Sequence, residues 1–186
     1  MAVLPIITVP NPILSKKTEK VKEFGKALEK TIKDMRDTLD AAHEPEGAGL
    51  SANQVGISQS ICIVRDFKET EEIDEKDLTN GDEPKMDTEI LKEVVLINPK
   101  ILSSSKEKYM DWEGCLSVPG LYGNVERPLK IRVSYQDERG KSKKLNAKGF
   151  FARVIQHEID HLNGILFTSK VRGNLVSEEF FNEAKS

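Results

Sequence analysis

Apolar residues recur at helical spacing over residues 23–42, and Lys, Glu and Asp residues fill the positions between them. This pattern predicts an amphipathic helix with one face in a core. Pro45 and Gly47 follow and are typical of residues that end a helix. The apolar positions of the predicted helix are Phe24, Leu28, Ile32, Met35 and Leu39.

Residues 58–64 and 94–97 are short apolar runs, which favour buried strands. Farther along, Ile131, Val133 and Tyr135 alternate with polar residues, and the polar residues 137–140 provide a turn. Leu145 and Ala147 belong to the expected return strand. The sequence therefore predicts a β-hairpin with one buried face.

A second helix is expected over residues 150–162, because Val154, Ile155, Ile159 and Leu162 give it an apolar face and Asn163-Gly164 is a typical C-terminal cap. Ser177, followed by two glutamates, predicts the start of a short terminal helix. The strands are mostly consecutive and lack regular crossover helices. This order favours an α+β fold with antiparallel sheets packed around the second helix.

Residues 66–93 differ in character from the rest of the chain. They hold twelve acidic and four basic side chains and few apolar ones, within a chain whose formal net charge is -3. We expect a solvated excursion rather than a second domain. The sequence therefore predicts a single domain over residues 1–186 with an acidic insert.

Composition excludes several classes of protein. Hydrophobic residues are 38% and charged residues 32% of the chain, as in globular proteins. The net charge of -3 argues against direct nucleic-acid binding, and no apolar run is long enough to span a bilayer. The first residues lack the features of a signal or transit peptide, so a cytoplasmic location is expected.

The two cysteines lie in different surroundings. Cys62 lies in an apolar, strand-like run and is expected to be a core residue. Cys115 lies in a polar, glycine-flanked segment, so a disulfide between them is not expected. Cys115 is therefore available for other chemistry.

Residues 157–161 (HEIDH) place His157 and His161 one helical turn apart, close enough to share a metal ion. Glu158 between them is placed to take a proton from a water on that metal. A catalytic site of this kind needs a third protein ligand. Cys115 is one candidate, and Glu178 or Glu179, as in a metallopeptidase, is the other.

Two further segments carry weaker signals. His43 lies at the end of the first predicted helix and is expected to be solvated. Residues 47–54 (GAGLSANQ) are rich in small side chains, which allow backbone to approach a ligand. Composition alone favours an ordinary loop for this segment.

Three motifs together resemble those of peptide deformylases: residues 47–54 (GAGLSANQ), 113–117 (EGCLS) and 156–161 (QHEIDH), in the order of that family. The resemblance runs from about Ile6 to about Thr168. There are three departures. Ser51 stands where the family commonly has alanine, the acidic insert is longer than usual, and Tyr122 stands where some members carry a substrate-facing arginine.

The resemblance implies that Cys115, His157 and His161 bind one divalent metal ion. Ferrous iron is expected, with zinc, nickel or cobalt as substitutes, because this donor set suits several metals. It also implies that Glu158 acts as general base and acid toward the water on the metal. The Gln54 side chain and the Leu116 backbone N–H would stabilise the oxyanion.

The implied substrate is an N-formyl-methionyl nascent peptide, from which formate is released. Ala48, Gly49 and Gly114 are expected to bind the peptide backbone. An apolar pocket for the methionine side chain is expected near Val154, Leu116 and Tyr122. Transient ribosome association is a family-level expectation, although residues 171–186 contain only two cations and favour no strong electrostatic docking.

Two alternatives remain at this stage. A metallopeptidase with Glu178 or Glu179 as the third ligand would keep its metal in Cys115→Ser. A non-catalytic module that binds nascent chain termini would hold a structural metal through four protein ligands.

Overall fold

The computed structural model describes residues 2–42, 47–67 and 90–185. The α-helices are α1 (Lys26–Asp40), α2 (Gly149–Leu162) and α3 (Glu178–Lys185). Short 3₁₀ helices lie at Pro12–Ser15, Ala52–Val55 and Phe167–Lys170. The strands are β1 (Gly49–Ser51), β2 (Ile61–Phe67), β3 (Ile90–Ser104), β4 (Lys108–Cys115), β5 (Val118–Pro128), β6 (Lys130–Gln136), β7 (Ser142–Lys148) and β8 (Val176–Ser177).

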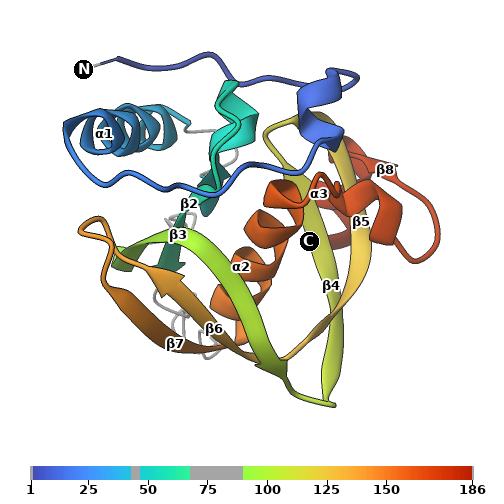
Figure 1. Ribbon diagram of the computed structural model, residues 1–186. Coiled ribbons are helices and arrows are strands. Elements are labelled where there is room, and N and C mark those ends of the chain that lie inside the picture. The colour runs from blue at the N-terminus through green and yellow to red at the C-terminus, as the bar shows by residue number, and fades with distance from the viewer. Residues whose placement is uncertain (1, 43–46, 68–89, 186) are drawn as a thin grey trace, which may run out of the picture.

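The strands form two antiparallel sheets on either side of α2 (Figure 1). One sheet has five strands in the order β1-β2-β3-β6-β7, and the other has three in the order β4-β5-β8. The α+β class with antiparallel sheets around a central helix, expected from the order of elements, is confirmed. So is the hairpin, which consists of β6 and β7.

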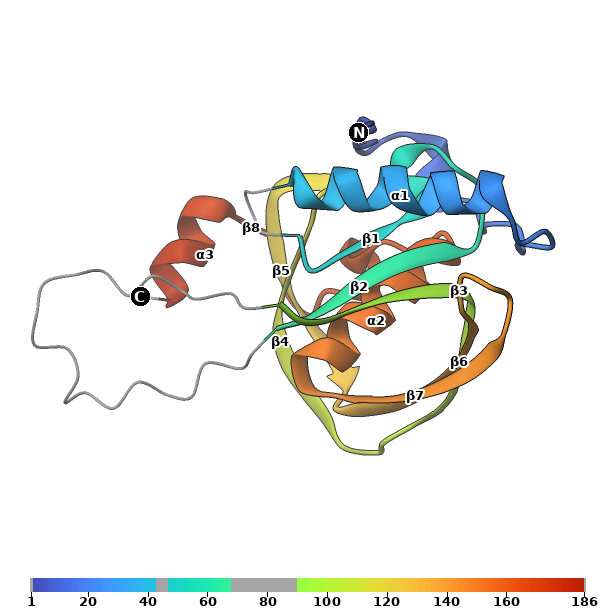
Figure 2. The same ribbon diagram turned by 90° about the vertical axis from the view of Figure 1, so that its left-hand side faces the viewer.

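Residues 61–65 of β2 and 94–97 of β3 are buried on both faces of the sheet, which explains the apolar runs in these strands. One face, with Cys62, Val64 and Leu96, packs against α2. The opposite face, with Ile63 and Ile97, packs against α1, which lies across the top of the sheet in Figure 2. The prediction that Cys62 is a core residue is confirmed, because the side chain is fully buried.

The first helix is shorter than its apolar pattern predicted. It begins at Lys26 rather than at residue 23, after Gly25, whose backbone is extended. Phe24 still packs against the core, but from the segment that precedes the helix. Phe24 therefore fits the helical spacing of apolar residues although it lies outside the helix. The predictions for His43 and Pro45 fall outside the described residues.

The strand boundaries at the acidic insert were also wrong. β2 begins at Ile61 rather than at residue 58 and continues to Phe67, and β3 begins at Ile90. Arg65 is buried and forms ion pairs with Asp40 and Glu93. The pairing of β2 with β3 therefore continues through charged residues, which the apolar pattern did not include. The predicted excursion therefore includes strand residues at both ends, and its part at 68–89 lies outside the described residues.

Helix α2 occupies the middle of the molecule, as predicted. It begins one residue before the expected start and ends at Leu162, where Asn163 caps it and Gly164 has a φ of 74°. Its apolar face packs on the five-stranded sheet. The terminal helix α3 begins at Glu178, directly after Ser177, as predicted. No described helix is long and apolar enough to cross a membrane.

Candidate metal centre

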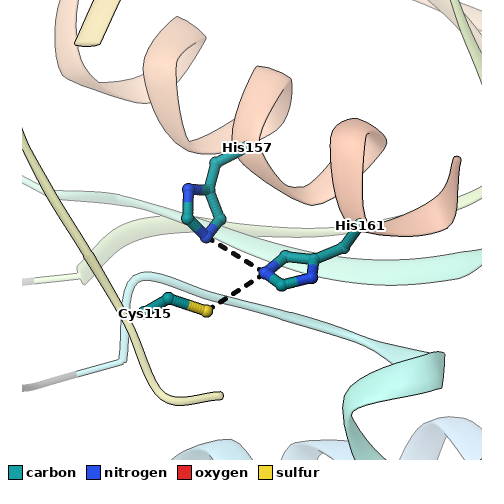
Figure 3. Close-up of side chains that lie close together, drawn as sticks. All are labelled: Cys115, His157 and His161. Carbon is teal, nitrogen blue, oxygen red and sulfur yellow. Dashed lines mark hydrogen bonds between the residues drawn. The ribbon is translucent and has the colours of Figure 1, made fainter. Parts of the chain in front are cut away.

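Three side chains converge between α2 and the end of β4 (Figure 3). The Cys115 Sγ lies 3.1 Å from Nε2 of His161, and this nitrogen lies 3.2 Å from Nε2 of His157. The three donor atoms all lie within 4.8 Å of one another. One ion can therefore be reached by all three.

The local structure explains why these donors meet. His157 and His161 are four residues apart on α2, so both rings project from one face of the helix. Cys115 ends β4 and pairs with Val118 across a tight turn. The Ser117 N–H donates to the sulfur at 3.4 Å and helps to fix its position.

The residues fit a divalent cation. Glu113 accepts a hydrogen bond from Nδ1 of His157 at 3.0 Å, which leaves the Nε2 lone pair directed at the other donors. Thiolate and imidazole are ligands that zinc and iron(II) accept. Burial alone would lower the pKa of His157, but Cys115 and Glu113 raise it well above its usual value. Burial and the charge of His157 lower the pKa of His161. A bound cation would compete with protons for these donor atoms.

Glu158 lies beside these donors and is buried, with 3% of its surface exposed. Ser51 Oγ lies 2.5 Å from Oε2 of this carboxylate and donates to it. Burial raises the pKa of Glu158, although the charge of His157 and the Ser51 hydrogen bond oppose that rise. A carboxylate whose pKa is raised holds a proton more readily, which suits a group that takes a proton and later returns it.

Composition alone favoured an ordinary loop for residues 47–54, and this expectation was wrong. The segment forms β1 and the 3₁₀ helix Ala52–Val55, and Ser51 and Gln54 within it are buried. The side-chain carbonyl oxygen of Gln54 accepts a hydrogen bond from the Ser51 N–H. The side-chain nitrogen of Gln54 donates to Ser117 Oγ at 3.2 Å and lies 3.6 Å from the Cys115 Sγ. Gln54 is therefore held with its N–H groups toward the metal donors.

Sequence reasoning missed a buried charge network behind His157. Glu113 accepts from Arg127 at 2.6 Å and from Arg153 at 2.7 Å, and Arg127 also donates to Asp160. Burial alone would raise the pKa of Glu113, but the hydrogen bonds from Arg127 and His157 lower that pKa far below the ordinary range. Asp160 and Glu113 lie inside the quoted motifs, whereas no local signal marks Arg127.

A cavity of about 230 Å³ opens beside the metal donors and contains the residues expected to bind substrate. Its lining also includes three aromatic side chains that were not predicted, Trp112, Phe150 and Phe181. The predicted residues in the lining are Ala48, Gly49, Gln54, Gly114, Cys115, Leu116, Tyr122, Val154, His157 and Glu158.

Two glycines of the lining are required by close packing. A Cβ on Gly49 would lie 2.6 Å from a carboxylate oxygen of Glu158. A Cβ on Gly114 would lie 2.6 Å from the ring of Tyr122. Each glycine therefore lets a side chain of the site approach the backbone, whether or not a peptide also pairs there.

The glutamate-liganded alternative is not supported. Within the described residues, the group able to hold a metal contains Cys115 and neither Glu178 nor Glu179. The described residues also add no fourth donor of the kind that a closed structural site requires. A thiolate and two histidines on an HExxH helix, with a buried glutamate beside a cavity, define a class of metal-dependent hydrolase.

Comparison with known proteins narrows this class. The family described as polypeptide deformylase matches residues 3–175. Peptide deformylase 1 of Bacillus cereus is 46% identical over 171 residues, which are 92% of this chain and 94% of that protein. Peptide deformylase of Rhizobium meliloti is 34% identical over all of this chain and 97% of its own.

Solved structures agree. A peptide deformylase from Synechococcus elongatus, in complex with actinonin, superposes with a TM-score of 0.74 at 36% identity and covers 97% of this chain and 83% of its own. A Met-Ala-Ser-bound peptide deformylase from Acinetobacter baumannii has a TM-score of 0.76 at 34% identity, covering 91% and 99%.

The chain belongs to the peptide deformylase family. It is thus a hydrolase of the family that removes the N-formyl group from nascent polypeptides, and members of that family depend on a metal.

Proposed function

We propose that Cys115, His157 and His161 hold one divalent cation, ferrous iron in the native enzyme, and that the neighbouring residues divide the work of deformylation. The observation that carries the proposal is the convergence of the three donor atoms within 4.8 Å beside the buried Glu158. A cation held there would polarise the formyl carbonyl and acidify the attacking water. Zinc, nickel and cobalt are possible substitutes, because the donor set accepts them.

Glu158 moves the proton. Its carboxylate takes a proton from water as the water oxygen bonds to the formyl carbon, and it returns that proton to the amine nitrogen as the C–N bond breaks. The products are formate and a free amino terminus. The Ser51 hydroxyl, 2.5 Å from Oε2, fixes the orientation of the carboxylate.

Gln54 and Leu116 stabilise the oxyanion that develops on the formyl oxygen. The Ser51 N–H fixes the side-chain carbonyl of Gln54, which holds the amide nitrogen beside the Cys115 Sγ. The Leu116 backbone N–H, adjacent to the metal-binding cysteine, supplies the second donor. Loss of one such donor typically lowers kcat about 10²–10³-fold.

The cavity beside the metal donors receives the peptide. Val154, Leu116 and Tyr122 form the apolar surface for the methionine side chain, and all three lie in the cavity lining. Ala48, Gly49 and Gly114 allow the peptide backbone to approach β1 and the end of β4 as an added strand. The substrate is therefore an N-formyl-methionyl nascent peptide.

We infer that residues 1–186 act as one domain in the cytoplasm, where formylated chains are made. The packing of the two helices supports a single domain. Helix α2 packs on one face of β2 and β3, and helix α1 packs on the other face of the same strands. Any association with ribosomes is transient on this proposal, since the C-terminal segment carries few cations.

The test is formate release from formyl-Met-Ala-Ser by the iron-loaded enzyme and by Glu158→Ala. We expect the variant to lose activity by at least about 10²-fold, the lower range for a general base, while keeping its metal. Metal analysis of Cys115→Ser and Glu179→Gln supplies the control for the ligand set. Cys115→Ser should lose bound metal and Glu179→Gln should retain it. Turnover that survives Glu158→Ala would falsify the role of that residue.

A further inference from the structure

The outer face of the five-stranded sheet is strongly basic at β6 and β7. The inner face of these strands packs on α2 through Ile131, Val133 and Ala147. Side chains alternate between the two faces of a strand, so the residues between these three point away from the helix. Figure 2 shows this part of the sheet curled around α2, on the side of that helix that is far from α1. The basic residues that point outward, all of them exposed, are Lys130, Arg132, Lys144 and Lys148.

Strand pairing brings these cations together. Lys130 lies directly opposite Lys148, and Ser134 of β6 lies between Lys144 of β7 and Lys100 of β3. Strands β6 and β7 contain no aspartate or glutamate. Like charges directly opposite one another destabilise a sheet, so the pair of lysines is not explained by stability. Among the described residues, neither these cations nor Lys100 has an ion-pair partner.

Protection of the sheet edge accounts for only part of this arrangement. Strand β7 is an edge of the five-stranded sheet, and lysines on an edge strand hinder its pairing with another chain. This role suits Lys144 and Lys148. It leaves Lys100, Lys130 and Arg132 unexplained, because β3 and β6 are paired on both sides.

A hollow of about 650 Å³ lies among these cations, where β3, β6 and β7 meet. Lysine and arginine side chains, hydroxyls and amides are the groups that bind phosphate oxygens in nucleic-acid complexes. The hollow offers all of these groups and shares no lining residue with the catalytic cavity. Its lining includes Lys130, Arg132, Lys148, Asn146 and the serines at 103–105.

The chemistry of this face favours a polymer of phosphates over a lipid surface. Elements that lie on membranes bury apolar side chains among the headgroups, and β6 and β7 have no large exposed apolar side chain. Cations that extend over three strands suit a partner with many regularly spaced charges. The family acts on nascent polypeptides, which are made on an RNA-rich particle, so RNA is the polyphosphate closest to the substrate.

We propose that a basic face, formed by Lys100, Lys130, Arg132, Lys144 and Lys148, binds the phosphate backbone of a structured RNA. Contacts to phosphates carry no sequence information, so binding does not depend on base sequence. The formal net charge of -3 does not describe this face. Residues 66–93 carry a net charge of -8, and the rest of the chain carries +5.

Fluorescence anisotropy with a labelled RNA hairpin tests the proposal on the full-length protein. Each phosphate contact adds roughly -0.7 to -0.9 to the slope of log K against log salt concentration. A triple variant with Lys130→Gln, Arg132→Gln and Lys148→Gln should bind at least about tenfold more weakly at about 0.1 M salt. Its slope should be shallower by about two to three. A hairpin of unrelated sequence should give the same results.

The matched control is a triple variant with Lys16→Gln, Lys30→Gln and Lys33→Gln, which loses the same charge from other exposed positions. It should bind RNA as the native protein does. Both triple variants should release formate from formyl-Met-Ala-Ser at the native rate, because none of the six residues lines the catalytic cavity. Normal formate release also shows that the variants are folded. Failure of the native protein to release formate would concern the proposed function alone.

Equal weakening of RNA binding in the two triple variants would overturn the proposal, because net charge alone would then account for binding. Absence of binding by the native protein at about 0.05 M salt would overturn it too. Binding to phosphatidylglycerol vesicles without binding to RNA would assign the face to a membrane instead. Displacement of the hairpin by polyglutamate as readily as by unlabelled RNA would show a face that accepts any polyanion, which also contradicts the proposal.

Discussion

Gly49 has no room for a side chain, because the Glu158 carboxylate packs directly against its backbone. The Glu158 carboxylate occupies the space where a Cβ would lie, with an oxygen 2.6 Å from that position. The carboxylate is buried and bonded to Ser51, so it has little room to withdraw. A glycine in a segment that composition alone assigned to a loop is thus tied directly to the proposed general base.

Gly49→Ala should therefore lower kcat about 10²-fold, because displacement of a catalytic group by about 1 Å costs a factor of that size. Metal content should be unchanged, since the three donors are Cys115, His157 and His161. Gly25→Ala is the matched control. Nothing lies within 4 Å of a Cβ at Gly25, and its extended backbone suits any residue, so formate release should be normal. Full activity of Gly49→Ala would contradict the packing argument.

Buried ion pairs join strands β4 and β5 to helix α2. The Glu113 side chain on β4 is 4% exposed, and it binds Arg127 of β5 and both Arg153 and His157 of α2. Buried charges of this kind add little net stability as a group, but removal of one partner leaves the others uncompensated. The same carboxylate orients a metal-binding histidine.

Glu113→Gln should destabilise the fold by about 3–5 kcal/mol, as loss of one partner of a buried ion pair does. It should also weaken metal binding about 10–100-fold through the misoriented His157. Urea unfolding and metal titration measure the two effects. Glu126→Gln removes an exposed ion pair with Lys108 on the same sheet and should leave the urea midpoint unchanged. Similar midpoints for the two variants would contradict the expected cost of leaving Arg127 and Arg153 uncompensated.

At the scale of the whole molecule, the metal centre joins the two sheets. Cys115 ends a strand of the three-stranded sheet, whereas His157 and His161 lie on the helix that packs on the five-stranded sheet. A cation bound by all three therefore holds the native arrangement and has no equivalent site in the unfolded chain. Binding of this kind stabilises the native state by RT ln(1 + [L]/Kd), where [L] is the concentration of the free metal ion.

Removal of the metal by a chelator should lower the Tm by roughly 10 °C. A ligand present at about 1,000 times its Kd adds about 4 kcal/mol, and about 1 kcal/mol moves the Tm of a chain this size by 2–4 °C. Thermal unfolding followed by circular dichroism, before and after chelation, measures the shift. Cys115→Ser, already short of a ligand, should show little further change. An equal shift in that variant would mean that the chelated metal lies elsewhere.

The elements that could be predicted from the sequence are those whose burial produces a periodic pattern. Helix α2 and the β6–β7 hairpin each bury one apolar face, so alternation or helical spacing is visible in the residues themselves. β4 and β5 were not predicted, because their inward side chains include Glu113 and Arg127 and their backbone includes Gly120 and Gly123. Buried ion pairs look the same in a sequence as solvated charges.

The sequence by itself determined the HExxH helix, its central position, the three motifs and, through them, the family. These depend on local spacing and on residue identity, which a sequence records directly. Only the tertiary structure decided that the Cys115 Sγ lies 3.1 Å from His161 and that Arg127 supports Glu113. It alone decided, too, that Phe181 faces the cavity. These contacts join segments far apart in the chain, and no local pattern encodes which distant partner a side chain meets.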